Sequence, residues 1–170
     1  MAPPSPAVLA QQAIAEMVLL KPSIELAPPP GSAGAVVGVP VWMWIDRGPS
    51  NTGPVSKSVS AGGITVTATA VVSEVDWAMG DGHSVTCTSP GTPYDISRAA
   101  QGSPDCGYVY QLRSLPERTG GSGKYQITAT SVWSIHWAGG GQQGNQTLRL
   151  SANAALAVGE LQSVNRGGNG

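Results

Sequence analysis

The side chains best suited to chemistry in this 170-residue chain are its aspartates and its two histidines. Several carboxylates brought together by loops would suit calcium, which takes many oxygen ligands. The aspartates considered for such a site are Asp76, Asp81, Asp95 and Asp105. Their spacing does not match an EF-hand loop, so we interpret Asp81 as a turn residue and expect no metal site. His83 and His136 lie far apart and complete no ligand spacing typical of zinc, so both are interpreted as surface histidines.

The sequence contains no pattern typical of a catalytic site. The nucleophile motif Gly-x-Ser-x-Gly is missing. The glycine-rich run at residues 120–124 ends in Lys124, but it has neither the Walker spacing nor a following Ser or Thr, and it precedes an expected strand. We therefore expect a hairpin turn there. Charged residues make up only 11% of the chain, too few for an obvious acid–base pair. We expect no enzymatic activity and no cofactor.

The charge balance limits the classes of partner. Nine basic residues face ten acidic residues, for a formal net charge of -1. This excludes the strongly basic surface typical of nucleic-acid-binding proteins or polybasic membrane proteins. The longest apolar stretch, residues 33–45, is too short to span a bilayer, so direct membrane insertion is not expected. No secretion signal follows Met1, so export would require that this chain is the mature part of a longer protein.

The two cysteines, Cys87 and Cys106, permit one intramolecular pairing. One interpretation is a single disulfide in an exported protein, and the other is two buried free thiols in a cytosolic domain. The charge-poor surface, rich in Ser and Thr, favours export to the cell surface or the extracellular space. A disulfide would close the loop at residues 88–105, which the chain-entropy description values at about 3 kcal/mol.

The N-terminal segment predicts a short helix over residues 6–20. Ser5 can cap this helix, Pro6 suits its first position and Pro22 stops it. A short strand at residues 23–26 and a proline-rich loop at residues 27–34 follow. The helix is expected to cover one end of a sheet, and a docking arm for a partner is the alternative.

From residue 35 onward, alternation of apolar and polar residues predicts strands. The expected strands are 36–45, 57–61, 64–72, 74–79, 84–87, 125–137 and 147–158. Gly62-Gly63 predicts a hairpin, and residues 139–144 predict a loose hairpin loop. Each strand is expected to have one solvent-exposed face and one buried face, and this pattern indicates an all-β, antiparallel sandwich. We expect three parts: residues 1–34 with the helix and the proline-rich segment, 35–165 as the β-sandwich domain, and 166–170 as a disordered tail.

Four tryptophans have two interpretations. They pack in the core, or they form an exposed aromatic strip that binds a glycan or a protein partner. Trp133 and Trp137 share the apolar face of their strand, which predicts core packing. Trp42 and Trp44 lie on a strand with two apolar faces, so they remain a candidate binding surface.

The segment at residues 75–82, Val-Asp-Trp-Ala-Met-Gly-Asp-Gly, resembles the signature of PKD domains. The positions that carry the resemblance are Trp77, Gly80, Asp81 and Gly82, then Tyr108 or Tyr110, then Gly123 and Tyr125. The resemblance covers about residues 62–158 and implies an immunoglobulin-like sandwich of the kind found in secreted or surface-anchored actinobacterial proteins. Two departures are Met79, where an aromatic residue is usual, and the long insertion between the two cysteines.

These patterns lead to three hypotheses about function. The first is a non-catalytic extracellular module for adhesion or for protein or carbohydrate binding at the cell surface. The second is a structural subunit of a secreted or surface assembly, in which a neighbour would bind the N-terminal helix and proline-rich segment and the low-charge surface would repel neighbours only weakly. The third is an accessory domain of an extracellular enzyme, which would require a deep pocket lined by titratable residues.

Overall fold

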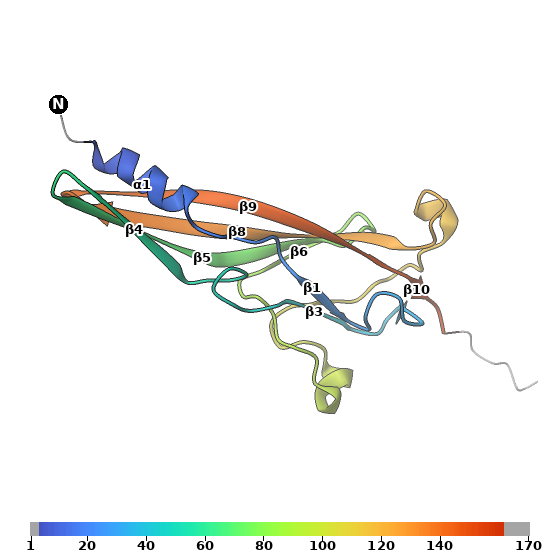
Figure 1. Ribbon diagram of the computed structural model, residues 1–170. Helices are drawn as coiled ribbons and strands as arrows, with labels where there is room; N and C mark the ends of the chain where they lie inside the picture. The colour runs from blue at the N-terminus through green and yellow to red at the C-terminus, as the bar shows by residue number, and fades with distance from the viewer. Residues whose placement is uncertain (1–3, 162–170) are drawn as a thin grey trace, which may run out of the picture.

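The computed structural model describes residues 4–161, which form an elongated, mostly antiparallel β-structure with one short α-helix (Figure 1). The expected all-β class with a short N-terminal helix is confirmed at this level, and the layers are consistent with a β-sandwich. The expected tail at 166–170 lies outside the described residues. The elements are α1 (Pro6–Ala15), β1 (Ile24–Ala27), β2 (Ala35–Val36), β3 (Val41–Ile45), β4 (Val55–Ala61), β5 (Ile64–Ala78), β6 (Ser84–Cys87), η1 (Ile96–Gln101), β7 (Gly107–Tyr108), η2 (Pro116–Arg118), β8 (Tyr125–Gly139), β9 (Gln142–Leu156) and β10 (Val158–Gly159).

A large five-stranded sheet runs the length of the molecule, in the order β4-β5-β8-β9 with β6 beside β5. Its three longest strands, β5, β8 and β9, have 15 residues each. The loop expected at 139–144 is in fact a tight turn, because the pairing of β8 with β9 continues to Gly139 opposite Gln142. Gly140 and Gly141 form this turn with φ of 58° and 78°, a conformation that glycine adopts without steric cost.

The predicted strands 64–72 and 74–79 are one strand, β5, interrupted by a bulge. The register with β8 shifts between Val72 and Glu74. One extra residue changes which face the following side chains occupy. Consequently Ala70 and Val75 both face inward although their numbers differ in parity, and Trp77 lies in the same core cluster as Val75. The bulge explains why the two alternating patterns in the sequence are out of phase.

Two separate layers cover the inner face of the large sheet. Helix α1 covers one end, and a three-stranded sheet of order β1-β3-β7 covers the other end (Figure 1). The core under the small sheet includes Leu26, Met43, Ile45, Trp77, Ile127 and Leu156, and the core under the helix includes Leu9, Ala13, Ala68, Trp133, Ile135 and Trp137. The outer face of the large sheet remains uncovered by any described element.

The N-terminal helix begins as predicted, since Ser5 accepts a hydrogen bond from the Val8 amide and Pro6 occupies the first turn. It ends at Ala15, earlier than expected. Trp133 and Trp137 are core residues as predicted, but α1 rather than a second sheet covers them. Because β1 pairs with β3 and α1 packs on β5, the segment 1–34 contributes to both layers over the large sheet.

Candidate functional site

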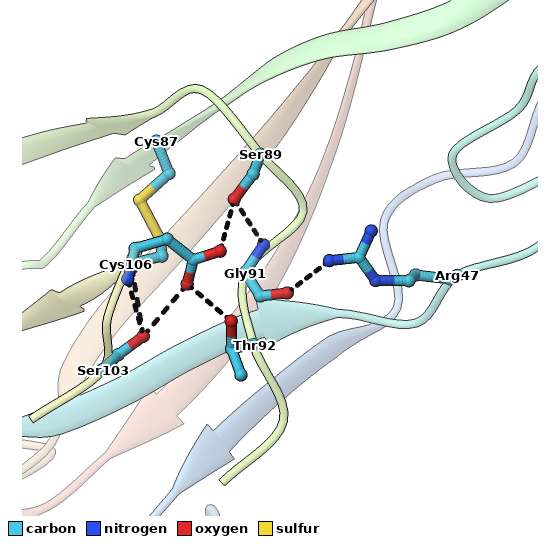
Figure 2. Close-up of a disulfide and its surroundings, with 8 residues drawn as sticks. Arg47, Cys87, Ser89, Gly91, Thr92, Ser103 and Cys106 are labelled. Atoms are coloured by element: carbon cyan, nitrogen blue, oxygen red, sulfur yellow. Dashed lines mark hydrogen bonds between the residues drawn. A yellow bond between two sulfur atoms is a disulfide. The ribbon is translucent and has the colours of Figure 1, made fainter.

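The strand expected over 36–45 is divided into β2 and β3, which Gly38 and Pro40 separate. Next to this break lies the loop between the two cysteines. Cys87 and Cys106 form a disulfide with their Cα atoms 5.6 Å apart, which confirms the disulfide alternative (Figure 2). Disulfides are typical of proteins in oxidising compartments, so this bond points to an extracellular environment.

The carboxylate of Asp105 organises the disulfide-closed loop. It accepts hydrogen bonds from the hydroxyls of Ser89 at 2.7 Å, Thr92 at 3.0 Å and Ser103 at 3.2 Å (Figure 2). Partial burial opposes ionisation of Asp105, but the three hydroxyl donors and nearby Arg47 outweigh it and hold its pKa below the usual value. Asp105 therefore ties the two ends of the loop together as a charged acceptor.

The same loop packs directly on β3 as a third layer. The Ile45 amide donates to the Pro90 carbonyl at 2.8 Å, and Arg47 donates through Nη2 to the Gly91 carbonyl at 2.7 Å. A Cβ atom at Gly91 would collide with the backbone of Met43, so only glycine permits this approach.

The packed loop changes the interpretation of the candidate binding strip at Trp42 and Trp44. Trp42 is only 1% exposed and lies edge-on to Tyr94, with ring centroids 5.4 Å apart. Trp44 is half-buried. Trp42 therefore cannot contact a partner directly, because it is covered by the loop between Cys87 and Cys106, which the PKD-like pattern had marked as an insertion. Tyr94 takes the exposed aromatic position instead and is 41% exposed.

Two shallow hollows meet at Pro40 on this end of the molecule. The first, of about 250 Å³, is lined by apolar side chains that include Pro28, Pro29, Val39 and Tyr94. The second, of about 430 Å³, lies on the other side of Pro40 and is lined by Gln101, Ser103, Asp105 and Val109 among others. Together they form one surface, the loop-end hollow, with an apolar half and a polar half.

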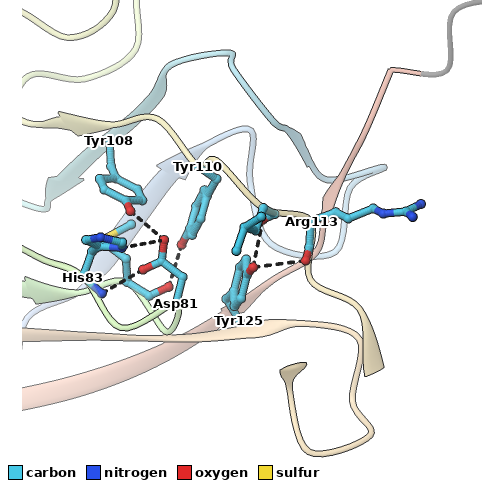
Figure 3. Close-up of polar contacts among 8 residues, drawn as sticks. Asp81, His83, Tyr108, Tyr110, Arg113 and Tyr125 are labelled. Atoms are coloured by element: carbon cyan, nitrogen blue, oxygen red, sulfur yellow. Dashed lines mark hydrogen bonds and ion pairs between the residues drawn. The ribbon is translucent and has the colours of Figure 1, made fainter. Parts of the chain in front are cut away.

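Asp81, Tyr108, Tyr110 and Tyr125 of the PKD-like signature lie close together (Figure 3). Gly80 and Gly82 have φ of 84° and 92°, and the Asp81 carboxylate accepts from the His83 amide at 3.0 Å, as a tight turn requires. Tyr108 donates its hydroxyl proton to the same carboxylate. The Asp81 side chain is 7% exposed, whereas the His83 ring, 3.4 Å away, lies in solvent. Asp81 is thus engaged in holding the turn.

Three tyrosines pack in series beside this turn. Tyr110 stacks on Tyr125 with ring centroids 4.9 Å apart and meets Tyr108 edge-on at 4.8 Å. Tyr110 donates to the Met79 carbonyl at 2.8 Å, and Tyr125 donates to the Leu112 carbonyl at 2.8 Å. Burial, followed by the negative charge of Asp81, raises the pKa of Tyr110. The network keeps its phenols protonated and joins the loop before β8 to the turn after β5.

The glycine-rich run at 120–124 is not a hairpin turn, because it connects η2 to β8 rather than two paired strands. Gly123 donates its amide to the Thr119 hydroxyl at 2.8 Å and accepts from Ser114 at 2.7 Å. The run therefore positions the start of β8, where Tyr125 enters the core.

The four aspartates considered for calcium do not converge. Asp95 caps η1 through the Ser97 amide, and Asp76 pairs with Arg149 on the outer face. Within residues 4–161, no three His, Cys, Asp or Glu side chains group closely enough to hold a metal ion. His136 lies on the exposed outer face and hydrogen-bonds Asn145 at 2.8 Å.

The outer face of the large sheet is the other extended surface. Hydroxyl pairs cross from β4 to β5 at 2.7–2.8 Å: Ser56–Thr69, Ser58–Thr67 and Ser60–Thr65. A hollow of about 500 Å³ lies at its centre around Val71, His136 and Thr147. Most polar groups on this face bond to one another across the strands, which is what a solvent-facing sheet does.

Sequence reasoning missed the residues that line the loop-end hollow. Pro28 and Pro29 belong to the segment predicted as a loop, and Tyr94 belongs to the loop between the cysteines. Neither segment has the periodicity that assigns a side chain to a face. The two segments come together at Pro40 through tertiary contacts, which the local sequence does not encode. The one sequence signal for Tyr94 is that it is an aromatic residue in a loop between two cysteines.

Comparison of the chain with protein-family models, with curated proteins and with solved structures gives no match. In the part of the chain that the structure describes, no helix has the length and apolar character needed to cross a membrane.

Proposed function

We propose that this protein is a non-catalytic extracellular binding module that uses the loop-end hollow to hold a protein partner at the cell surface. The observation that carries the proposal is the exposed apolar half of that hollow, where Tyr94 of the disulfide-closed loop lies beside Val39 and adjacent prolines of the segment before β3. Binding residues are often placed on loops that a rigid sheet scaffold positions. We propose in addition that the chain is a PKD-like module, and the contacts of Asp81 with the His83 amide and the Tyr108 hydroxyl support this.

The disulfide-closed loop, which contributes Tyr94 to the hollow, is held in place by several contacts. The disulfide, the hydroxyl contacts of Asp105 and the Arg47 contact fix it on β3. A surface that is ordered before binding loses less conformational entropy when its partner arrives. The loop is therefore suited to recognition by a preformed surface.

The lining favours a protein partner over a glycan. Proline, valine and tyrosine side chains lie on the apolar half, and aromatic residues are enriched in protein interfaces. The polar half offers the Gln101 and Ser103 side chains at its rim. A glycan would be expected to use more hydrogen-bonding groups than the apolar half presents.

The carboxylates near these surfaces are engaged in structure, which supports a non-catalytic role. Asp105 accepts three hydroxyl hydrogen bonds, and Asp81 accepts from Tyr108 and from the His83 amide. General acid–base catalysis requires a group that can exchange its proton with a substrate. Both carboxylates instead use their oxygens to hold neighbouring loops.

The direct test is saturation binding of the fluorescently labelled protein to cells of the organism that encodes it. We expect saturable binding that brief protease treatment of the cells abolishes and periodate oxidation of surface glycans leaves intact. Tyr94→Ser and Val39→Ser should each weaken binding about tenfold, which corresponds to roughly 1.4 kcal/mol.

His136→Ser is the matched control, because it alters the hollow on the opposite, outer face of the large sheet. It should bind like the unaltered protein. Loss of binding in His136→Ser with normal binding in Tyr94→Ser would assign binding to the outer face and contradict the proposal. Sensitivity to periodate alone would indicate a glycan partner instead.

A further inference from the structure

Strand β9 presents a long open edge. It is the last strand of the large sheet and pairs with β8 alone along all of its 15 residues. In an antiparallel strand, alternate residues direct their N–H and C=O groups to opposite sides, so roughly half of these groups point away from the sheet. Within residues 4–161, no segment other than β8 forms a backbone hydrogen bond with β9.

The two edges of the large sheet differ in their protection against pairing. On the opposite edge, β4 is only seven residues long, follows Pro54 and carries Lys57. Short length, proline and lysine are common devices that prevent edge-to-edge association. β9 has none of these features, and its single charged side chain, Arg149, is held to Asp76 at 3.2 Å across the outer face. The β9 edge therefore has the properties of a strand that pairs.

Helix α1 lies beside β9 at one end of the large sheet (Figure 1). Gln11 of α1 donates to the Gln146 side chain of β9 at 2.8 Å, which places the helix against the edge. Gln11 also lines a hollow of about 470 Å³ on the helix with Ala7, Val8 and Ala15. Leu148 of β9, next to this contact, is 37% exposed although it belongs to the apolar face of its strand.

We propose that β9 pairs antiparallel with β9 of a second copy of this chain, about a two-fold axis that passes close to Leu148. A two-fold interface requires one surface to complement itself, and like charges placed opposite each other are the main obstacle. β9 has one charge, so only the register that opposes Arg149 to itself is disfavoured. An axis at Leu148 places Arg149 opposite Thr147 and each Leu148 opposite its counterpart.

This register brings the two molecules into contact along both β9 and α1. Gln142 of one copy lies opposite Ala154 of the other, so the strands overlap over nearly the whole of β9. The sheets become one continuous sheet whose apolar faces lie on the same side, because residues of equal parity oppose each other. The two α1 helices then lie near the axis, where the small side chains of Ala7 and Ala15 permit close approach.

Cysteine cross-linking tests the register directly. Both native cysteines are in the disulfide, so a cysteine introduced by Leu148→Cys is the one free thiol in the protein. Opposed residues of an antiparallel pair have Cα atoms about 4.5–5.5 Å apart, within the range of a disulfide. Mild oxidation should therefore convert most of the Leu148→Cys protein to a covalent dimer of twice 17.3 kDa on non-reducing gels.

The matched control is Ser58→Cys, an exposed position in the middle of β4 on the opposite edge. It should remain monomeric on the same gels. Absence of a dimer in Leu148→Cys, or equal dimer in both variants, would overturn the proposed pairing.

Light scattering over a concentration series provides an independent measurement. The unaltered protein should reach twice 17.3 kDa, and Leu148→Lys, which places two like charges at the axis, should remain at 17.3 kDa with an unchanged circular dichroism spectrum. Ser58→Lys adds the same charge to the opposite edge and should still dimerise. A monomer at every concentration would overturn the proposal. Pairing of β9 with a strand of a different protein would then be the alternative.

Discussion

Two aspartates show how single residues hold the loops of this protein. Asp81 joins the turn after β5 to Tyr108 of β7, and Asp105 joins the two ends of the disulfide-closed loop. In both cases several donors meet one carboxylate, which makes the bonds stronger than those between neutral groups. Asp81 and Asp105, which the sequence analysis considered for calcium binding, are therefore structural in their contacts.

Asp81→Ala should lower the free energy of unfolding by about 1–3 kcal/mol. The substitution leaves the part-buried Tyr108 hydroxyl without its acceptor, and an unpaired group that is shielded from water carries this penalty. Urea unfolding followed by tryptophan fluorescence measures the change. Asp46→Ala, which removes one exposed contact from Ser23, is expected to cost less than about 0.5 kcal/mol. Equal effects of the two substitutions would contradict the role given to Asp81.

Asp105 should make the protein sensitive to acid. Burial opposes ionisation, but the hydroxyl donors and Arg47 lower the pKa of Asp105 in the folded protein. Its carboxylate therefore favours folding when it is ionised, above the pKa of the unfolded chain. This contribution is lost as the pH falls through the lowered pKa. Asp105→Asn should be less stable than the original protein at pH 7, and the difference should shrink by pH 3. Parallel stability curves of the two proteins between these pH values would show that the hydroxyl contacts are unimportant.

At the scale of elements, the long sheet has different covers at its two ends. α1 buries Leu9 against Trp133 and Ile135, while β3 buries Met43 and Ile45 against the other half. Strand alternation in the sequence predicts the inward face of β8 correctly, from Tyr125 to Trp137. That local pattern cannot show whether a helix or a strand covers the face, because either presents apolar side chains.

Two other features, the bulge in β5 and the loop that covers Trp42, could not be predicted from local sequence patterns. The bulge in β5 appears in the sequence only as a change of phase at residue 73, which resembles the end of one strand and the start of another. The cover over Trp42 comes from a loop about fifty residues further along the chain, near Tyr94. The hairpin at Gly62-Gly63 and the turn at Gly80 to Gly82 were predictable, because glycine is the residue that most readily adopts the positive φ of such turns.

Leu9→Ala should test the packing of α1 on the sheet. Leu9 is 1% exposed in the core under the helix, and truncation of such a side chain typically costs about 2–5 kcal/mol. Its neighbour Val8 is 50% exposed, so Val8→Ala should cost under about 1 kcal/mol. Thermal unfolding by circular dichroism measures both. Similar melting temperatures for the two variants would mean that α1 contributes little to the stability of the sheet.

At the scale of the whole molecule, α1 lies at one end of the long sheet, and the disulfide-closed loop projects from the side of the molecule, away from α1 (Figure 1). The loop-end hollow lies far from the helix-covered end, where α1 adjoins the β9 edge. A dimer formed through β9 would leave both loop-end hollows accessible. Two linked binding sites would then raise the apparent affinity for a surface that displays many copies of the partner.

Loss of the disulfide should affect both stability and binding. The double substitution Cys87→Ser with Cys106→Ser removes a constraint on a loop of sequence separation 19, for which about 2–4 kcal/mol is typical. The loop should also loosen on β3, which exposes Trp42 and shifts tryptophan emission to longer wavelength. Binding to cells should weaken, because Tyr94 is carried by that loop. Unchanged binding after loss of the disulfide would count against a preformed recognition surface.

The proposed function requires that the loop-end hollow is the surface that contacts the partner. Photo-cross-linking tests this claim directly, with p-benzoylphenylalanine placed at Tyr94 in one protein and at His136 in another. Irradiation of each protein on cells of the encoding organism should give one discrete protein adduct from position 94 and none from position 136. An adduct from position 136 alone, or none from position 94 under conditions of saturable binding, would contradict the proposed function.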